Sequence, residues 1–434
     1  MIVRFEQAWC DTLEALRRNR QGVLREVGRV VLVRDLFGRL HLALERAARA
    51  EHLDVLLEEI AGSAGPFWSG QVLDGETMYA SEHVFESPDR VDLGAGLWGV
   101  ERSVIGAEWG RGPLPNRGLR PPRATLYGLK GGVGRSTALS VWARHLAEVG
   151  KRVLVVDLDL ESPGVSSLLL PAEAKSDFGI VDWFVEDAVG NADQELLQLM
   201  VTTSPVAGGT AGEVLVAPCA GTVGSDYVAK LARAYVDLPG PDGRGRGFAE
   251  RLAELIDQLE ETHRPDVVLL DSRAGLHDLA GVATTRLDAM TFLFAVGTRQ
   301  TWDGYRILLR SWAGHPSVAR EVRERVRVVA SQIPETERTP YLERLREAAY
   351  DVFSESLYEE AGPDDSEAFN FDVTVTDAPH DPLRIYWSRA LQDWEPTSDA
   401  VSPEQLDASF SDFLVRATEL VLSEGAETGG IRGG

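Results

Sequence analysis

The chain has 434 residues, 44% of them hydrophobic, and a formal net charge of −24 at pH 7. This length allows about two or three domains, and the strong negative charge disfavours non-specific binding to DNA or to anionic membranes, because both require cationic surfaces. The two cysteines lie too far apart for a CxxC metal or redox motif, no apolar run reaches the ~18 residues that span a bilayer, and the N-terminal segment lacks the apolar core of a signal peptide, so we expect a cytoplasmic protein.

Residues 1–109 predict a small α+β domain. Apolar runs at 29–33 and 39–44 flank the turn sequence DLFG and predict a β-hairpin, while residues 3–18 and 47–60 predict helices and residues 78–85 another strand. Four aromatic residues are expected to pack this domain or, alternatively, to form a binding surface: Phe67, Trp68, Trp98 and Trp109. Because no pattern here is typical of an active site, we expect the domain to bind a protein partner.

Residues 110–123 are dense in glycine, proline and arginine, and they predict a linker, because such a segment cannot continue a helix or a central strand.

From residue 124 onward, strands and helices alternate. The expected strands are the apolar runs at 152–156, 267–270, 290–296 and 326–330, and the expected helices include 248–262, 302–312 and 338–360. Residues 124–424 therefore predict an α/β domain with a mostly parallel, doubly wound sheet, followed by a flexible tail over 425–434.

A glycine-rich segment lies near the start of this second domain. Residues 130–137 read KGGVGRST, follow an apolar run at 124–127 and precede a helix-like stretch at 138–148. A strand, a glycine-rich turn and a helix form a phosphate-binding loop, in which backbone N–H groups and the helix dipole face an anion. The alternative is a simple tight turn, but that interpretation leaves the lysine, serine and threonine unexplained.

Two acidic motifs follow apolar strands further along the chain. Asp157 and Asp159 end the run VLVVDLD, and Asp271 ends VVLLD in the sequence DSRAG. Ligands of open α/β sheets bind beyond the carboxyl ends of the strands. Carboxylates near phosphates are useful when a cation lies between them, so the motifs imply Mg²⁺. Alternatively, Asp157 and Asp159 cap a following helix.

Together, these motifs in residues 124–331 resemble the ParA/MinD family of P-loop ATPases, which carry a deviant Walker A motif that begins with lysine. The family pattern KGGxGK[ST][ST] corresponds to KGGVGRST, its DxD to VVDLD and its DxxAG switch to DSRAG. The arginine resembles a KGGVGR variant subgroup found in bacteria. The resemblance implies a P-loop NTPase fold, ATP and magnesium as ligands, and a homodimer that forms in response to nucleotide.

The resemblance also implies roles for individual residues. Lys130 would reach the phosphates across the dimer interface, Asp159 would orient the attacking water, and Gly275 would let the switch move with the γ-phosphate. Ser136, Asp157 and Asp271 would hold Mg²⁺. The phosphates would be bound by the segment that contains Gly131, Gly132, Val133, Gly134, Arg135, Ser136 and Thr137, with Thr137 at the α-phosphate.

The sequence departs from the family pattern in three places. Arg135 replaces the loop lysine, and a planar guanidinium is not equivalent to a compact ammonium group. Arg273 stands where relatives often have proline. Near Ser331 and Gln332, relatives usually have an asparagine that reads adenine, so the choice between adenine and guanine stays open.

Three functional hypotheses remain. The first is a slow ATPase switch, with Lys130, Asp159 and Arg135 as catalytic residues. The second is a non-hydrolysing adaptor in which Arg135 locks the bound nucleotide. The third, a regulatory ATPase of a bacterial conflict or defence system, rests on the subgroup resemblance alone. The charge argues against nucleic acid, and the tail GAETGGIRGG offers no basic amphipathic helix for a membrane.

Overall fold

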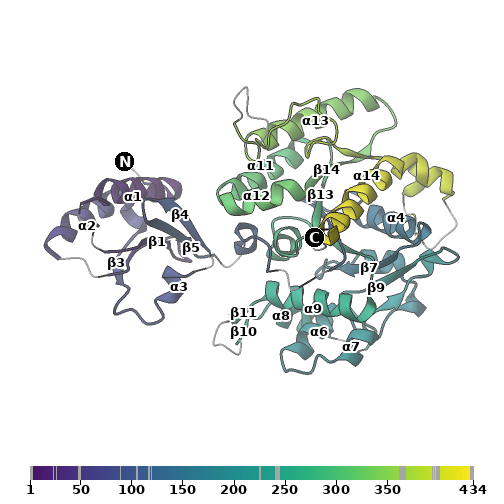
Figure 1. Cartoon of the computed structure of the whole chain (residues 1–434), viewed down its shortest axis with the longest axis horizontal. Coiled ribbons are helices and arrows are strands. Elements are labelled where there is room, and N and C mark those ends of the chain that lie inside the picture. The colour runs from purple at the N-terminus through teal and green to yellow at the C-terminus, as the bar shows by residue number, and fades with distance from the viewer. Residues whose placement is uncertain are drawn as a thin grey trace. The chain divides into compact units, whose positions relative to one another are not determined.

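The computed structural model describes residues 3–22, 24–25, 27–46, 50–87, 89–103, 106–115, 118, 120–223, 226–239, 245–360, 368–392, 394, 396 and 401–430. Its contacts divide the chain into two units, Met1–Arg111 and Gly112–Gly434. Figure 1 shows the elements of both units.

The first unit is built on a five-stranded sheet with the strand order β3-β2-β1-β5-β4. The expected hairpin is present, because β1 and β2 pair in antiparallel fashion around the DLFG turn. One face of the sheet, with Val30 and Leu32, packs against α1 and α2, and the other face carries Val31 and Val33. The elements are α1 (Phe5–Asn19), β1 (Val30–Arg34), β2 (Leu40–Leu44), α2 (Ala50–Ala64), β3 (Trp68–Asp74), α3 (Glu82–Phe85), β4 (Arg90–Gly94) and β5 (Leu97–Glu101).

The strand expected over residues 78–85 is wrong. The chain forms a turn there and then the short helix α3, whose Val84 and Phe85 are buried. A short apolar run fits a buried helical turn as well as a strand, so its pattern could not separate the two. Of the four aromatic residues, Trp109 is buried, and Phe67, Trp68 and Trp98 are half-buried against the sheet.

The second unit is built on an eight-stranded sheet with the order β15-β14-β13-β6-β12-β7-β9-β8. All neighbouring strands are parallel except β8, which runs antiparallel to β9. The mostly parallel α/β fold expected from the sequence is confirmed. The strands are β6 (Arg123–Gly128), β7 (Arg152–Asp157), β8 (Thr202–Thr203), β9 (Glu213–Ala217), β12 (Val267–Asp271), β13 (Met290–Ala295), β14 (Val326–Ile333) and β15 (Leu383–Tyr386), with a separate two-stranded pair, β10 (Leu238–Pro239) and β11 (Gly245–Arg246).

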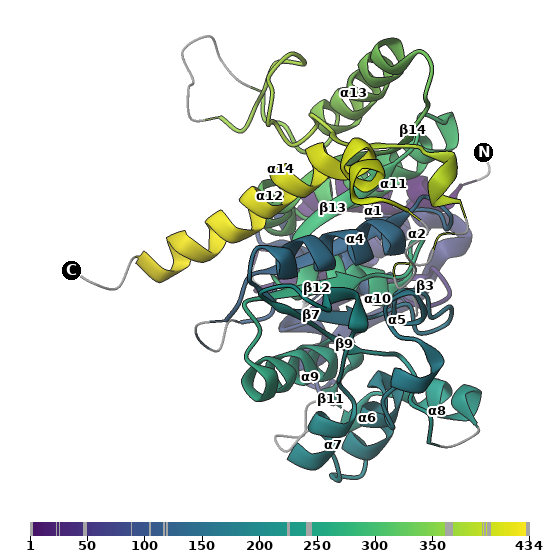
Figure 2. The same ribbon diagram turned by 90° about the vertical axis from the view of Figure 1, so that its right-hand side faces the viewer.

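Helices cover both faces of this sheet, as the two views in Figures 1 and 2 show. Alternate strand residues supply two separate cores: Val153 and Val155 pack with α4 and α14, whereas Leu154 and Val156 pack with α6, α7 and α9. The helices are α4 (Arg135–Glu148), α5 (Val165–Leu169), α6 (Ile180–Asp187), α7 (Gln194–Leu199), α8 (Tyr227–Ala234), α9 (Phe248–His263), α10 (Asp278–Gly281), α11 (Arg299–Ala313), α12 (Pro316–Arg325), α13 (Arg338–Ser354) and α14 (Pro403–Gly430).

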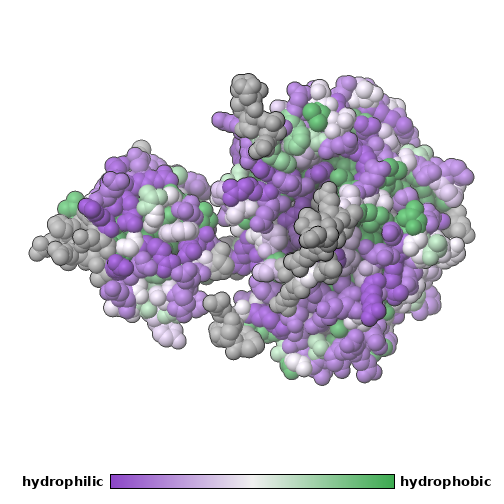
Figure 3. Space-filling view, viewed as in Figure 1, coloured by the Kyte–Doolittle hydropathy of each residue, from purple (hydrophilic) through white to green (hydrophobic). Residues whose placement is uncertain are grey.

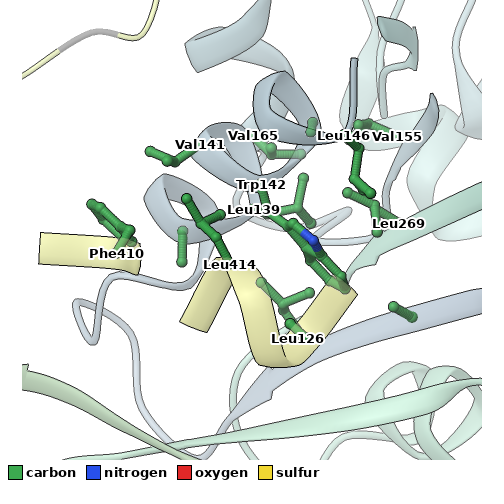
Figure 4. Packing of buried hydrophobic residues seen from close by; sticks show 14 of the residues in the cluster. Leu126, Leu139, Val141, Trp142, Leu146, Val155, Val165, Leu269, Phe410 and Leu414 are labelled. Carbon is green, nitrogen blue, oxygen red and sulfur yellow. The ribbon is translucent and has the colours of Figure 1, made fainter. Parts of the chain in front are cut away.

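Trp142 is the centre of the first of these cores (Figure 4). Its ring is fully buried, meets Phe292 of β13 and Phe413 of α14 edge-on, and donates a 3.0 Å hydrogen bond from Nε1 to the hydroxyl of Thr418. Helix α4, which begins at the glycine-rich loop, is thereby fixed between the sheet and α14. The glycine-rich loop is therefore joined to a helix that is buried against the core.

The two segments expected to lack regular structure differ from each other. The described part of residues 112–122 lies outside helices and strands, and β6 begins at Arg123. Helix α14 continues to Gly430, so the tail expected from residue 425 is helical as far as residue 430, and its flexibility stays a prediction; residues 431–434 lie outside the described residues. Once Phe410 and Phe413 anchor a helix, each further turn forms at low cost.

The surface is mixed in character. In the view of Figure 3, hydrophilic residues dominate and hydrophobic ones are scattered among them. Within the part of the chain that the structure describes, no helix is both long and apolar enough to cross a membrane.

Candidate functional site

The three motifs of the sequence analysis meet at one edge of the eight-stranded sheet. Strand β12 lies between β6 and β7, so the glycine-rich loop after β6 and the acidic motifs that end β7 and β12 come from three adjacent strands. Asp271 pairs in register with Asp157 of β7 on one side and with Leu126 of β6 on the other. The fold therefore brings both acidic motifs to the loop at residues 130–137, which we call the P-loop.

The P-loop turns sharply at two glycines. Gly132 and Gly134 have φ values of +75° and +81°, a left-handed conformation that favours glycine. Two side chains at the end of β14 hold the loop from behind: Ser331 donates a hydrogen bond from its hydroxyl to the carbonyl of Val133, and Gln332 donates from Nε2 to the carbonyl of Gly132 at 2.8 Å. Both side chains, which stand near the position where relatives usually have an adenine-reading asparagine, therefore brace the loop through its carbonyl groups.

Ser136 and Asp271 form the closest contact between the P-loop and an acidic motif. The hydroxyl of Ser136 donates a 2.7 Å hydrogen bond to Oδ2 of Asp271. The other carboxylate oxygen, Oδ1, is buried and has no hydrogen-bond partner. Burial raises the pKa of Asp271 to about 7, although the nearby positive charge of Arg135 acts in the opposite direction. A buried carboxylate oxygen without a partner is unfavourable unless a cation satisfies it.

Asp157 is also buried but is turned toward the loop that follows it. Its Oδ2 accepts hydrogen bonds from the backbone N–H and the hydroxyl of Ser166 at 3.1 and 2.6 Å, and its Oδ1 accepts one from the N–H of Asp159 at 3.3 Å. Burial raises the pKa of this carboxyl group. The capping alternative therefore describes Asp157, which binds the first turn of α5, better than it describes Asp159.

Arg135 contacts the segments that follow the two acidic strand ends. Its side chain is only 7% exposed, its Nη1 donates a hydrogen bond to the carbonyl of Ser272, and its Nη2 lies 3.6 Å from Oδ2 of Asp159. Burial raises the pKa of Asp159, and the charge of Arg135 opposes that shift. Lys130 points elsewhere, since its Nζ donates a hydrogen bond to Oε1 of Gln300 on α11.

The loop at residues 271–277, which we call the switch loop, is docked on the end of β6. The N–H of Gly275 donates to the carbonyl of Gly128 at 3.1 Å, and the hydroxyl of Tyr127 donates to the carbonyl of Gly275 at 3.2 Å. Gly275 has a φ of +85°, which a residue with a side chain rarely adopts. Tyr127 was not predicted as a site residue, because a tyrosine within an apolar strand gives no indication of such a hydrogen bond.

A pocket of about 220 Å³ opens beside the P-loop. Gly134 and Thr137 line one side of it, and β14 and the segment that follows β15 line the others. The sequence analysis did not predict this pocket, because β15 has only four residues and no clear periodicity. Its remaining lining residues are Ser331, Gln332, Ile385, Tyr386, Trp387, Ser388, Leu391, Gln392 and Phe410.

Across the described residues, no group of three or more His, Cys, Asp or Glu side chains converges on a point that could hold a metal ion by itself. The hydroxyl of Ser136 and the orphaned oxygen of Asp271 are nevertheless hard oxygen donors next to a phosphate-binding loop. Magnesium normally takes few protein ligands and completes its shell with phosphate oxygens and water, so this donor set fits it.

Comparisons with known proteins gave matches among solved structures. No protein-family model matches the chain, and a search of curated protein sequences found no match. The septum site-determining protein MinD of Pyrococcus horikoshii, complexed with Mg-ADP, is similar at 19% identity and a TM-score of 0.41, over 69% of this chain and 97% of MinD. Cobyrinic acid a,c-diamide synthase of Mycobacterium smegmatis, with ADP and magnesium bound, is similar at 18% identity and a TM-score of 0.39, over 56% of this chain and 86% of the synthase.

A third similar structure is that of the pNOB8 ParA protein bound to nonspecific DNA. It shares 15% identity and a TM-score of 0.39, over 71% of this chain and 99% of ParA. Identities this low do not transfer a function, so the assignment depends on this chain's own geometry. The loop after the central strand β6, the two acidic strand ends beside it and the mostly parallel strand order identify the second unit as a P-loop NTPase fold that resembles the ParA/MinD family.

Proposed function

We propose that the chain binds ATP with Mg²⁺ at the edge formed by β6, β12 and β7, and that it acts as a slow ATPase switch. The observation that carries the proposal is the contact between Ser136 and Asp271. It places a hydroxyl and an unsatisfied buried carboxylate oxygen directly behind the P-loop. A structural turn would have no need for a buried charge at this point.

The chain's own groups divide the work of binding. The backbone N–H groups of residues 131–134 and the N-terminus of α4 bind the phosphates, Thr137 binds the α-phosphate, and Lys130 adds a positive charge. Ser136 and Asp271 would hold the metal, with Asp157 behind them. When bound, Mg²⁺ would neutralise part of the negative charge of the phosphates.

The pocket beside the P-loop takes the nucleoside. It adjoins Gly134 and Thr137 on the phosphate side and offers Trp387 and Phe410 as aromatic walls, a composition that suits a planar base. Ser331 and Gln332 contribute atoms to the same pocket, but their hydrogen bonds to the P-loop reduce their capacity to read the base. We therefore propose that the pocket binds a purine base. Ser331 and Gln332 are not assigned a role in the choice between adenine and guanine.

Asp159 orients the attacking water. It is 14% exposed and lies beside Arg135, whose positive charge opposes the rise in pKa that burial causes. The Gly275 hinge lets the switch loop respond to the γ-phosphate. In the ATP-bound state, two copies of the chain would form a dimer in which Lys130 reaches the nucleotide of the other copy. The first unit would then bind a protein partner in response to this dimeric state.

A second candidate function is a nucleotide-binding adaptor that does not hydrolyse ATP. The ion pair between Arg135 and Asp159 favours it, because a carboxylate paired with arginine is less free to act on water. The net charge of −24 argues against a DNA partner for either function. The conflict-system hypothesis rests on the subgroup resemblance alone.

Calorimetry with ATP and Mg²⁺, followed by phosphate release, tests the proposal. Lys130→Ala should weaken ATP binding at least tenfold, or about 1.4 kcal/mol, and Asp159→Ala should abolish release while binding persists. Lys175→Ala and Asp407→Ala, at exposed positions, are the matched controls. Binding without release in the unmodified chain would favour the adaptor, and no binding of any purine triphosphate would contradict both functions.

A further inference from the structure

Two arginines from different loops pair with the same third loop. The third loop consists of residues 158–164 and connects β7 to α5; we call it the acidic loop. Arg135, at the start of α4, lies 3.6 Å from Asp159 of the acidic loop, and Arg273, in the switch loop, forms a 2.5 Å ion pair with Glu161. These two arginines are also the residues at which the P-loop and the switch depart from the family pattern.

Backbone contacts join the same three loops. The N–H of Leu158 donates to the carbonyl of Asp271 at 3.0 Å, which links the acidic loop to the start of the switch loop. Arg135 donates to the carbonyl of Ser272, one residue further along the switch loop. The P-loop, the acidic loop and the switch loop thus form one closed ring of contacts, in which each loop touches the other two.

The acidic loop has a second set of partners beyond the nucleotide site. The hydroxyl of Tyr235 donates to Glu161 at 2.7 Å, and the hydroxyl of Tyr227, on α8, donates to the carbonyl of Leu160 at 2.7 Å. Glu161 therefore receives an arginine from the switch loop and a tyrosine from the segment after α8. With both partners in place, it is held in one position.

We propose that Arg135 and Arg273 are positioning residues that hold the acidic loop, and with it Asp159, in register with the switch loop. The proposal rests on the nucleotide site described under the proposed function. In this arrangement Arg135 acts on Asp159 and on the switch backbone rather than as a substitute for the phosphate-binding lysine. When the switch loop moves, Arg273 moves Glu161, and Asp159 follows two residues away.

The surroundings of the two ion pairs explain why they hold a loop. Exposed ion pairs contribute little to stability, but Arg135 and Asp159 are 7% and 14% exposed, and Arg273 and Glu161 are 30% and 24% exposed. A guanidinium group can donate a hydrogen bond through one nitrogen and form an ion pair through another, as Arg135 does here with Ser272 and Asp159. Lysine has a compact and strongly hydrated ammonium group, which does not reach the carbonyl of Ser272 and the carboxylate of Asp159 in the same way.

Hydrogen exchange of the nucleotide-free full chain tests this positioning role. Arg273→Gln should increase exchange about threefold at the amides of residues 158–164, as expected for the loss of one partly buried ion pair, while β7 and α9 remain unchanged. Arg273→Lys should restore most of the protection. Arg299→Gln, at a side chain that is 93% exposed, is the matched control. Unchanged exchange over 158–164 in Arg273→Gln would overturn the proposal, as would an equal increase throughout the sheet.

Arg135→Gln adds a second arm. It should increase exchange in both the acidic loop and residues 272–275, because it removes contacts to both.

In turnover, Arg273→Gln should lower kcat about tenfold with less than a twofold change in KM, the result expected when a catalytic group is displaced but binding is intact. A rise in KM with kcat unchanged would contradict a positioning role.

The two proposals fail in different ways. If the unmodified chain binds no nucleotide, the proposed function is wrong, yet the exchange comparison still decides whether the arginines hold the loop. If nucleotide binds normally and exchange over residues 158–164 is the same in all variants, the positioning role is wrong and the proposed function stands.

Discussion

Ser136 and Asp271 stand 135 residues apart in the chain, and the hydroxyl of Ser136 donates a 2.7 Å hydrogen bond to the carboxylate of Asp271. One residue comes from the first turn of α4 and the other from the last position of β12. The contact joins a loop that suits phosphate to a carboxylate that suits a cation.

Asp271→Asn should separate the binding of metal from the binding of phosphate. An amide cannot supply the negative charge that attracts Mg²⁺, so the tenfold or greater gain in ATP affinity expected from added Mg²⁺, about 1.4 kcal/mol or more, should disappear. Binding in the presence of EDTA should change little. Calorimetry with and without Mg²⁺ measures both quantities, and a variant that keeps the full Mg²⁺ effect would contradict the assignment of Asp271 as a metal ligand.

Arg135→Lys should lower phosphate release while ATP binding persists. The lysine side chain has one ammonium group, whereas Arg135 contacts both the carbonyl of Ser272 and the carboxylate of Asp159. We expect kcat to fall about tenfold, equivalent to about 1.4 kcal/mol in the barrier. Single-turnover release measured beside equilibrium binding checks this, and a large gain in release would instead support the non-hydrolysing adaptor.

Trp387→Ala should weaken binding of ATP more than binding of inorganic tripolyphosphate. Trp387 lines the pocket beside the P-loop, and its side chain is partly exposed and therefore free to contact a base. Stacking of a base on an aromatic ring contributes about 1–3 kcal/mol, so ATP affinity should fall about tenfold or more. Tripolyphosphate serves as the internal control, because it contacts the P-loop only; equal losses for both ligands would place the base elsewhere.

Trp142→Phe and Trp142→Ala should destabilise the second unit in graded fashion. The ring fills the space between α4, β13 and α14 (Figure 4). Removal of a buried tryptophan side chain costs about 3–5 kcal/mol, and the smaller phenylalanine substitution should cost less. Urea unfolding, monitored by hydrogen exchange of the amides in α4, measures the loss of stability. An unchanged unfolding midpoint in the alanine variant would contradict the packing role.

Asp35 should make the hairpin of the first unit sensitive to acid. Burial alone would raise its pKa, but hydrogen bonds from His41 and from the backbone N–H groups of Arg39 and Phe37 outweigh it and lower the pKa to about 2. A carboxyl group with a lowered pKa stabilises the fold above its unfolded value of about 3.9, and that stabilisation is lost as the pH falls toward 2.

The Asp35→Asn variant provides the measurement. At pH 7, exchange of the amides in β1 and β2 should be faster in the variant than in the unmodified chain, and the difference should shrink between pH 4 and pH 2.5. Glu76→Gln, at an exposed turn position of the same unit, is the control. A difference that is constant with pH would show that the charge of Asp35 does not stabilise the hairpin.

Much of the second unit could be predicted from local sequence. The strands β6, β7, β12, β13 and β14 are apolar runs separated by helical segments, and that pattern requires a sheet covered on both faces. Strand β9 has the same kind of pattern, EVLVA, and could have been found from it. The two-residue β8 and the four-residue β15 are too short to carry a period, so only their pairing partners show them to be strands.

The candidate site divides in the same way. A glycine-rich turn, two acidic strand ends and a following helix can each be predicted locally, because each is a property of a few consecutive residues. The rule that ligands bind at the carboxyl ends of strands then places them together. The partners of the side chains depend on long-range packing. Gln332 braces the loop at Gly132, 200 residues away, and Arg135 pairs with Asp159. Helix α3 forms where the sequence predicts a strand. In each case long-range packing selects one arrangement among several that the local pattern allows equally.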